Sequence, residues 1–231
     1  CNVAQGNINQ ERLLRLIVDD DADFVLLQEV MDESKISLPK TWHSLRAGRM
    51  VIASRFPLRE RLTVTRDLPE RWPRPVGVIA EGAAQERTIQ IGAVYLHSPR
   101  LGLTKMLDGR TGLAPSRRQT LVEETAKRAA ESRHVAESFA EIEGSLIVAG
   151  DFNTPAESWL FDEYWGDFEN GFSRAGWGIG NTCFLERRGL TFGARIDHVL
   201  TRGNWRVSRC WVGPDVGSDH RPVLADVVWE E

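Results

Sequence analysis

The sequence contains few cysteines and no long apolar segment. Its three cysteines, Cys1, Cys183 and Cys210, lie far apart and form no Cys-x-x-Cys pair. An odd and sparse set of this kind argues against a disulfide framework and against a structural zinc site. No apolar run approaches the roughly 20 residues that a membrane-spanning helix requires. No basic segment followed by an apolar one indicates a signal peptide.

An excess of positive charge is absent as well. The chain has 29 Lys and Arg against 33 Asp and Glu, which gives a formal net charge of −4. No overall basic field is therefore available to hold nucleic acid by charge alone, and this argues against a tight non-specific DNA-binding protein. A nuclease is not excluded, because a bound metal ion supplies positive charge locally.

The remaining composition is that of an ordinary globular chain. Hydrophobic residues make up 42% of the 231 residues and charged residues 27%. The sequence contains no internal repeat and no low-complexity linker. We therefore expect one α/β domain over residues 1–231, with β-sheets covered by helices.

Hydrophobic patterning predicts alternating helices and strands. A helix is expected over residues 10–20 with Asn9 as its N-cap, and a second from residue 115 to about 142. The sequence Thr154-Pro155-Ala156-Glu157 fits a capping box, which predicts a third helix through about Trp165. Strands are expected over residues 23–27, 49–54, 88–96, 145–149, 195–200, 205–212 and 222–229.

Acidic and imidazole side chains follow several of these strands directly. Glu29 comes after an apolar run, and so do His97 and Asp151. Binding sites of α/β sheets gather at the carboxyl ends of strands, so we expect these side chains to lie close together. The pair Asp219-His220 follows a Gly-Ser turn and precedes another strand.

Two asparagines, Asn2 and Asn153, add neutral oxygen atoms to this set. Carboxylate and amide oxygens without thiolates suit magnesium or manganese better than zinc. Taken singly, each residue has a plainer explanation: Glu29 as a solvated loop carboxylate, Asp151 in an Asx turn, His97 as a structural histidine. Their joint occurrence favours a site.

Seven motifs resemble those of the endonuclease/exonuclease/phosphatase superfamily of metal-dependent phosphoesterases, which includes deoxyribonuclease-like enzymes. The resemblance covers nearly the whole chain, and the Gly150–Asn153 and Ser218–Pro222 motifs are specific together. The motifs are Asn2-Val3, Leu27-Gln28-Glu29, Ile52-Ala53-Ser54-Arg55-Phe56-Pro57, Leu96-His97-Ser98, Gly150-Asp151-Phe152-Asn153, Arg195-Ile196-Asp197-His198 and Ser218-Asp219-His220-Arg221-Pro222. The resemblance implies a four-layer α-β-β-α sandwich with two mixed β-sheets packed face to face.

The resemblance also implies roles for individual residues. Asn2, Glu29 and Asp219 match positions of the metal site, which would take Mg²⁺ or Mn²⁺. The other matches are catalytic: Asp151 and Asn153 hold the nucleophilic water and the phosphate, His220 is the catalytic histidine, Asp197 orients it, and His97 is a second histidine.

From these roles we expect a metal-held phosphate attacked by water that a His-Asp pair activates. The working hypothesis makes His220 the base. Arg118, near the start of the long helix, is a candidate phosphate contact, because arginine forks suit phosphate. The stretch from Arg66 to Arg74 either tracks a nucleic-acid strand or, more simply, forms a proline-rigidified surface loop.

Three functions remain open at this stage. The first is a nuclease or related phosphodiesterase, which His97 favours. The second is a phosphatase or phospholipase-like enzyme acting on lipid or inositol phosphates. The third is a non-catalytic binding module on the same scaffold. The sequence implies a phosphoester substrate, leaves nucleic-acid binding open, and implies no stable protein partner.

In this family an apolar strand normally precedes the position matched by Asn2, whereas here only Cys1 does. We therefore expect an upstream segment, which in some bacterial relatives includes a membrane anchor or export sequence. A mature lipoprotein beginning at Cys1 is the alternative, and localisation stays open. If Asn2 is displaced, the metal would depend on Glu29 and Asp219, with Asn7 as a weak substitute.

Overall fold

A six-stranded mixed sheet forms the centre of the protein. The computed structural model describes the chain apart from residues 67–72, 85–86, 100–114 and 188. Strands β6 and β7 are parallel, and the other neighbours in this sheet are antiparallel. The strand order is β4 (Leu58–Thr65), β5 (Pro75–Ala84), β6 (Arg87–Tyr95), β7 (Leu146–Asp151), β11 (Asp197–Arg202) and β8 (Glu169–Asn170).

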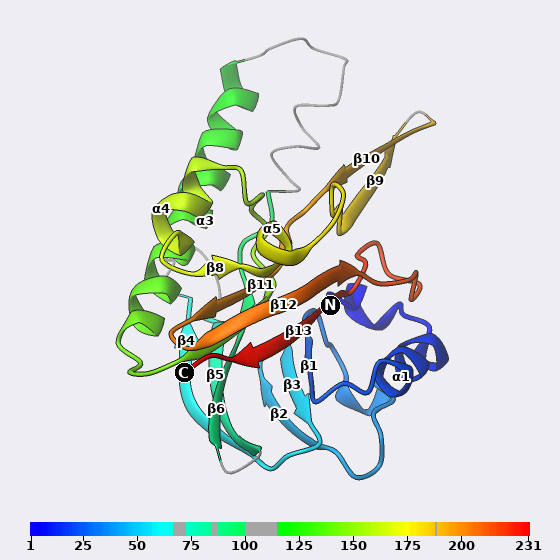
Figure 1. Cartoon of the computed structure of the whole chain (residues 1–231). Helices are drawn as coiled ribbons and strands as arrows, with labels where there is room; N and C mark the ends of the chain where they lie inside the picture. Colours follow the sequence, from blue (N-terminus) through cyan, green and yellow to red (C-terminus); the bar gives the residue numbers. More distant parts are fainter. Residues whose placement is uncertain (67–72, 85–86, 100–114, 188) are drawn as a thin grey trace.

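A second layer of strands packs against this sheet. Three antiparallel strands form one part of the layer: β1 (Phe24–Leu27), β3 (Met50–Ser54) and β2 (His43–Ala47). The antiparallel pair β12 (Trp205–Val212) and β13 (Val223–Trp229) forms the other (Figure 1). A parallel bridge joins Asn2 to Gln28 just beyond β1. Buried side chains from both layers fill the space between them, among them Ile52, Ile91 and Trp205.

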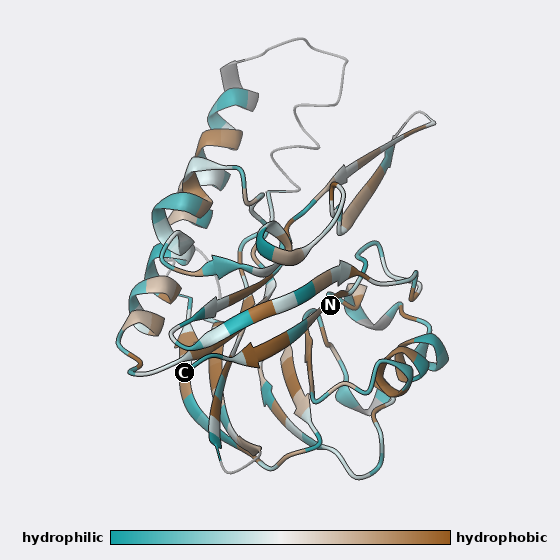
Figure 2. Ribbon diagram, viewed as in Figure 1, coloured by the Kyte–Doolittle hydropathy of each residue, from teal (hydrophilic) through white to brown (hydrophobic). Residues whose placement is uncertain are grey.

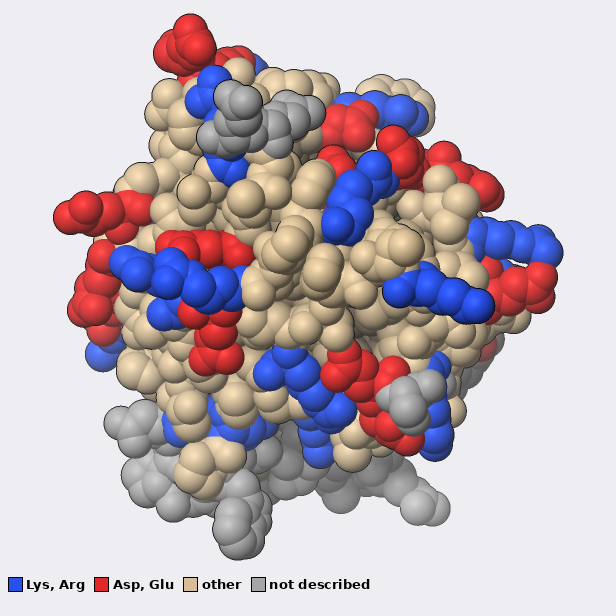
Figure 3. Space-filling model, turned by 90° about the horizontal axis from the view of Figure 1, so that it is seen from below, with Lys and Arg blue, Asp and Glu red and all other residues tan. Residues whose placement is uncertain are grey.

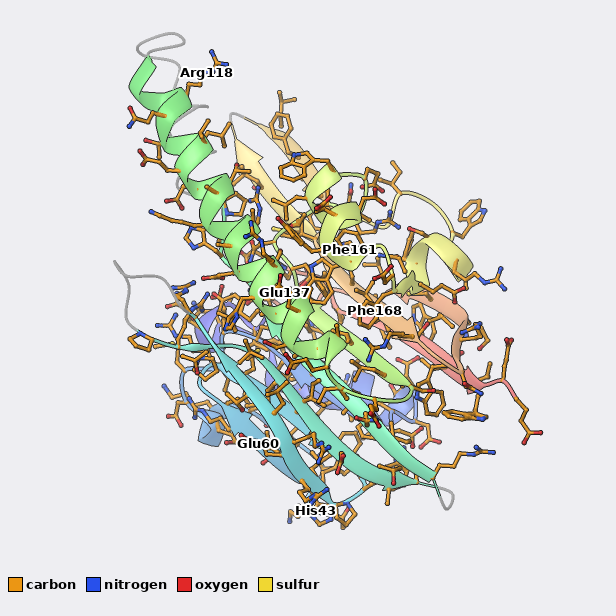
Figure 4. All side chains as sticks on the ribbon, turned by 90° about the vertical axis from the view of Figure 1, so that its left-hand side faces the viewer. His43, Glu60, Arg118, Glu137, Phe161 and Phe168 are labelled. Atoms are coloured by element: carbon orange, nitrogen blue, oxygen red, sulfur yellow. The ribbon has the colours of Figure 1, made fainter. Side chains whose placement is uncertain are left out.

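Helices cover the two outer faces. Helices α3 (Pro115–Ala140) and α4 (Trp159–Trp165) lie on the six-stranded sheet, and α1 (Gln10–Asp19) lies on the other side of the molecule (Figure 1). Figure 4 shows Phe161 and Phe168 beside α3, and both belong to a core cluster with buried strand residues. On the opposite side, Leu13 and Ile17 of α1 pack against β1 and β3. The order helix, sheet, sheet, helix is the predicted four-layer sandwich.

The remaining elements are short. They are the 3₁₀ turns η1 (Ala4–Gly6) and η2 (Glu33–Lys35), helix α5 (Gly171–Ala175), and the hairpin of β9 (Cys183–Arg187) and β10 (Leu190–Ala194). In Figure 1 this hairpin projects from the body of the sandwich. Figure 2 shows apolar residues on both of its strands as well as on the strands of the core.

The long predicted elements are confirmed, but the capping box is wrong. As expected, the Asn9 side chain accepts a hydrogen bond from the Arg12 backbone N–H at 3.0 Å and starts α1. The predicted helix start at Thr154 fails because its hydroxyl donates to the Phe152 carbonyl at 3.0 Å. Helix α4 begins only at Trp159, where Ser158 provides the N-cap.

The buried face of α3 is not purely apolar. Val122 of this helix is 60% exposed. The buried side instead carries Val135 and Phe139 together with Glu124 and Glu131. Burial of two glutamates on a helix requires partners from the sheet side, and the structure supplies them.

The surface shows no single dominant charge on the face seen in Figure 3, where acidic and basic side chains are interspersed. This agrees with the small net charge of −4. Among the helices in the described part of the chain, none is both long and apolar enough to cross a membrane.

Candidate active site

The parallel pairing of β6 with β7 brings two motifs together. In this register Tyr95 lies opposite Asp151, and just beyond it the Leu96 N–H donates to the Asp151 carbonyl at 3.0 Å. The Asn153 side chain in turn donates to the Leu96 carbonyl at 3.0 Å. Parallel strands end at the same edge of a sheet, so His97, the next residue along, follows β6 at the edge where β7 delivers Asp151 and Asn153.

Asn2 links the carboxylate of Glu29, which lies just beyond β1, to that of Asp151 at the end of β7. Its side-chain amide donates to Glu29 Oε1 at 3.0 Å and to Asp151 Oδ2 at 3.1 Å. The orientation of the amide is fixed because its Oδ1 accepts from the Ala4 N–H at 2.9 Å. In this arrangement Asn2 holds the two carboxylates by its N–H groups, and its predicted role as a metal ligand stays a prediction.

Tyr95 is a site residue that the sequence interpretation missed. Its hydroxyl donates to Glu29 Oε1 at 2.9 Å, and its ring is buried. Burial and the nearby negative charge of Glu29 raise the pKa of Tyr95 to about 12, so the hydroxyl remains a donor at neutral pH. The signal was available, because positions two apart in a strand face the same side, and Tyr95 precedes His97 by two.

Asp197 and His220 form a buried pair. His220 Nδ1 lies 2.8 Å from Asp197 Oδ2, and both side chains are 4% exposed. Burial favours the uncharged forms, but their mutual attraction outweighs it: the pKa of Asp197 is lowered and that of His220 is raised. The position of Asp197 is fixed by Thr182, whose Oγ1 accepts the Asp197 N–H at 3.1 Å.

Asp151 lies beside this pair and completes a compact cluster. Single ligand atoms of Asp151, Asp197 and His220 all lie within 4.8 Å of one another, and all three residues are buried. Burial and the negative charge of Asp197 raise the pKa of Asp151 to about 7. Its Oδ1 accepts from the Asn153 N–H at 2.9 Å. The cluster therefore holds a carboxyl group that changes charge near neutral pH.

His97 has a carboxylate partner that the sequence did not indicate. Its Nε2 lies 2.5 Å from Glu124 Oε2 on α3, with both side chains buried. Burial opposes ionisation of Glu124, but the contact with His97 and with Lys127 outweighs it and lowers its pKa. In the sequence, Glu124 is only a polar residue of a helix. Its role as the partner of His97 becomes visible once the structure places α3 over β6.

Two predicted residues lie at exposed positions. Asp219 is exposed, and its carbonyl accepts from the Phe184 N–H at 3.1 Å. Arg118 is exposed near the start of α3, and Figure 4 shows it at the end of the helix farthest from the sandwich. The proposed roles of Asp219 in metal binding and of Arg118 in phosphate binding stay predictions.

His198, next to the catalytic candidate Asp197, is a structural histidine. It is 1% exposed, and its Nε2 lies 2.9 Å from the Thr154 carbonyl, which can only accept. Its Nδ1 therefore accepts from the Asn170 side chain at 3.1 Å. Burial lowers the pKa of His198 to about 4, so the ring stays neutral at physiological pH. His43 and His134 are exposed.

Comparison with known families identifies this arrangement. The profile of the endonuclease/exonuclease/phosphatase family matches residues 1–220. The chain belongs to this family. Members of the endonuclease/exonuclease/phosphatase family are metal-dependent phosphoesterases, and the chain is accordingly an enzyme of the phosphoester hydrolase class.

Solved structures with the family fold agree over nearly the full chain. TDP2 from D. rerio, complexed with a single-stranded DNA product, has a TM-score of 0.70 at 12% identity and covers 95% of this chain and 91% of its own. The Neisseria 3′ phosphatase NExo, bound to a product DNA hairpin, has a TM-score of 0.60 at 19% identity, with coverage of 96% and 97%.

A mannosyl-6-phosphatase from Bacteroides thetaiotaomicron has a TM-score of 0.61 at 13% identity, covering 96% of this chain and 91% of its own. At such identities the likeness establishes the fold, while the named activities belong to those proteins. None of the curated proteins compared with the sequence matches it.

The side chains present fit the divalent cation on which the endonuclease/exonuclease/phosphatase family depends. Glu29 and Asp151 share the Asn2 amide as a hydrogen-bond donor, and Asp197 adds a third carboxylate close to Asp151. One of these carboxyl groups has its pKa raised by burial and by a like charge. A hard divalent cation prefers oxygen ligands, and these carboxylates provide them. When bound, it would offset their excess of negative charge.

Proposed function

We propose that the protein is a phosphodiesterase of the nuclease class that hydrolyses its substrate with Mg²⁺ or Mn²⁺. The observation that carries this proposal is the buried cluster of Asp151, Asp197 and His220, joined through Asn2 to Glu29. It combines an oriented histidine, a carboxyl group of near-neutral pKa and a set of hard oxygen ligands. Metal-assisted hydrolysis of a phosphoester can use each of these three elements.

His220 is proposed to bind the phosphoryl group as an imidazolium ion. The His220 ring is also contacted by the Cys183 side chain. Asp197 holds its Nδ1, which leaves Nε2 for the proposed contact with a substrate. The same contact raises the pKa of His220 and favours the protonated form. This differs from the initial hypothesis that His220 is the base, because a cationic imidazole donates hydrogen bonds and accepts none.

Asp151 is the proposed acceptor of the proton from the attacking water. Its raised pKa, to about 7, suits a group that gains and loses a proton near neutral pH. The water oxygen attacks phosphorus, the bond from phosphorus to the leaving oxygen breaks, and that oxygen takes up a proton. His97, buried against Glu124, is the candidate donor for this second transfer.

Glu29 is the proposed main ligand of the cation, with Asp219 as a further candidate, and Asp151 lies beside this position through its link to Asn2. When bound there, a divalent cation offsets the negative charge that develops on the phosphoryl oxygens. Tyr95 and Asn2 keep Glu29 in place by donating to the same oxygen, Oε1. Because these contacts use Oε1, the Oε2 atom is the better placed ligand.

The test is a hydrolysis panel with purified protein in Mg²⁺ or Mn²⁺. Plasmid DNA, single-stranded RNA and bis-p-nitrophenyl phosphate represent diesters, while p-nitrophenyl phosphate and an inositol polyphosphate represent monoesters. Sphingomyelin tests the phospholipase-like alternative. Controls are EDTA, His220→Ala and the exposed-histidine variant His134→Ala, which should retain full activity.

We expect diesters to be cleaved with loss of activity in EDTA and in His220→Ala. Release of inorganic phosphate from monoesters alone would replace the diesterase proposal with a phosphatase of the same cluster. Turnover that is unaffected by both EDTA and His220→Ala would refute the proposal altogether. A folded, metal-binding protein without turnover would favour the binding module.

A further inference from the structure

The two ends of the arginine-rich stretch that links β4 to β5 lie inside the protein. The sequence favoured a surface loop for Arg66–Arg74, and residues 67–72 lie outside the described part of the chain. At its ends, the Arg66 N–H donates to the Arg74 carbonyl at 2.8 Å. Arg66 is 8% exposed and pairs with the buried Glu131 of α3. The stretch therefore directs its two terminal arginines into the molecule.

Arg74 lies directly against a residue of the candidate site. Its guanidinium carbon is 4.3 Å from the centre of the Tyr95 ring. The hydroxyl of that same ring donates to Glu29 Oε1 at 2.9 Å. Stacking on an aromatic face holds a guanidinium group in one orientation while leaving its N–H edges open to other partners.

Among the residues that the structure describes, no carboxylate forms an ion pair with Arg74. Its neighbour Glu131 pairs with Arg66 instead. The Arg74 Nε atom is buried and lacks a hydrogen-bond partner there. Burial and the positive charge of Arg66 lower the pKa of Arg74. A desolvated cation with a free donor gains most from an anion.

A second arginine with similar stacking shows what a structural pair looks like in this chain. The Arg87 guanidinium lies 4.8 Å from the centre of the Trp229 ring, at the far end of β6 from the site. Unlike Arg74, Arg87 has an ionic partner, Glu231, at 3.8 Å. Both arginines stack on an aromatic ring, but among the described residues only Arg87 also has a carboxylate partner. This difference makes Arg74 the candidate for binding an anion.

We propose that Arg74 is a phosphate-binding residue, which donates to a non-bridging oxygen of the substrate's phosphoryl group or of the phosphate next to it. This inference rests on the proposed function and assigns a substrate contact in the same site. Its guanidinium is linked to Glu29 through Tyr95, and His220 is linked through Asp197 to the cluster that contains Asp151. A phosphate bound among these residues would receive N–H donors from both Arg74 and His220.

The test compares Arg74→Gln and Arg74→Lys with the matched control Arg87→Gln. Two measurements are made on each variant in Mg²⁺: titration with inorganic phosphate by calorimetry, and the kinetics of the best diester substrate. The unfolding temperature is recorded without phosphate, so that a loss of folding is separated from a loss of binding. Arg74→Lys keeps the charge and loses the planar fork.

We expect Arg74→Gln to weaken phosphate binding and raise KM by roughly 10- to 100-fold, as loss of a charge-assisted hydrogen bond does. Arg74→Lys should recover part of this, and Arg87→Gln should match the wild type. Unchanged phosphate affinity and KM in a folded Arg74→Gln variant would overturn the proposal.

The two proposals can fail separately. A wild-type protein that binds phosphate through Arg74 but hydrolyses no ester would refute the diesterase function while upholding the phosphate contact. An active enzyme whose Arg74→Gln variant loses stability but keeps its KM would leave the function intact. In that case Arg74 only supports Tyr95, and the inference is wrong.

Discussion

Asp151 and Asp197 are direct cross-strand partners on the antiparallel strands β7 and β11. Two like charges opposite each other in a sheet are destabilising, and here both side chains are also buried. The fold accepts this arrangement because His220 compensates Asp197, while Asp151 receives hydrogen bonds from Asn2 and Asn153. The remaining repulsion appears as the raised pKa of Asp151.

This repulsion predicts that stability depends on pH and on divalent cations. The folded pKa of Asp151, about 7, exceeds its ordinary value of 3.8. Its contribution to stability is therefore complete below about pH 4 and is lost as the pH rises through 7, a loss on the order of 4 kcal/mol. We expect Mg²⁺ to raise the unfolding temperature more at pH 8 than at pH 5, as measured by calorimetry.

The variant Asp151→Asn should lose most of this cation effect, because the charge that the cation offsets is gone. Asp226→Asn, which removes an exposed aspartate, serves as the matched control and should retain the full effect. An equal Mg²⁺ shift at both pH values would contradict a cation site beside Asp151.

Asp197→Asn should lower kcat by roughly 10²- to 10⁴-fold, the range expected when a proton-transfer or charged group is disabled. Without the carboxylate, the attraction that raises the pKa of His220 disappears, so this pKa should fall in an NMR titration. Asp162→Asn, on the exposed side of α4, should change neither quantity. An Asp197→Asn variant with wild-type kcat would rule out an essential His-Asp pair.

His198 should weaken the protein in mild acid. Its folded pKa of about 4 lies below the ordinary 6.5, so the unfolded chain takes up a proton first as the pH falls. The free energy of unfolding should drop between about pH 6.5 and 4, by on the order of 3 kcal/mol. Urea denaturation of wild type and His198→Asn measures this contribution by difference, with His134→Asn as the exposed control.

In that comparison the two proteins share the opposing contribution of Asp151, which therefore cancels. The His198→Asn variant is expected to be less stable at pH 7, since it loses the hydrogen bond to Thr154, but to show a shallower pH dependence. Parallel curves for the two proteins would mean that His198 does not titrate on unfolding.

Gly150→Ala should disrupt the junction between β6 and the site. Gly150 has φ +152°, and a Cβ atom there would lie 2.0 Å from the Val94 carbonyl oxygen. Because overpacking and backbone strain each cost roughly 1–3 kcal/mol, we expect a loss of about 3 kcal/mol or more in chemical denaturation. Gly189→Ala has φ +77° but open space around it, and should cost only roughly 1–2 kcal/mol. Similar losses for both would exclude the steric explanation.

Much of the fold was predictable because its central strands are continuous apolar runs. Leu146–Asp151 and Trp205–Val212 correspond closely to the predicted strands. Strand β4 escaped notice because its alternating Arg and Glu residues are exposed, and β5 because it begins with Pro75 and contains two glycines. These two strands owe their place to pairing with each other and with β6, which local sequence does not reveal.

Side chains that follow a strand in sequence could be predicted as neighbours, and the structure brings Glu29, His97 and Asp151 to one end of the sandwich. Their partners could not be predicted in the same way. Glu124 reaches His97 from a helix, and Arg74 reaches Tyr95 from the position just before β5. These contacts depend on tertiary packing, so residues far apart in the sequence carry no local sign of them.

Thr182 gives the projecting hairpin a further significance. It is fully buried at the base of β9, where its N–H donates to Ala194 and its carbonyl accepts from Arg221. Its hydroxyl oxygen also fixes Asp197. Cys183 and Phe184 still pair with the backbone of His220 and Asp219. The part of the hairpin beyond Phe184 can therefore lengthen, shorten or change its apolar side chains in descendants of this enzyme without moving the His-Asp pair. Selection can thus change the surface that the hairpin offers to other molecules while the catalytic pair stays the same.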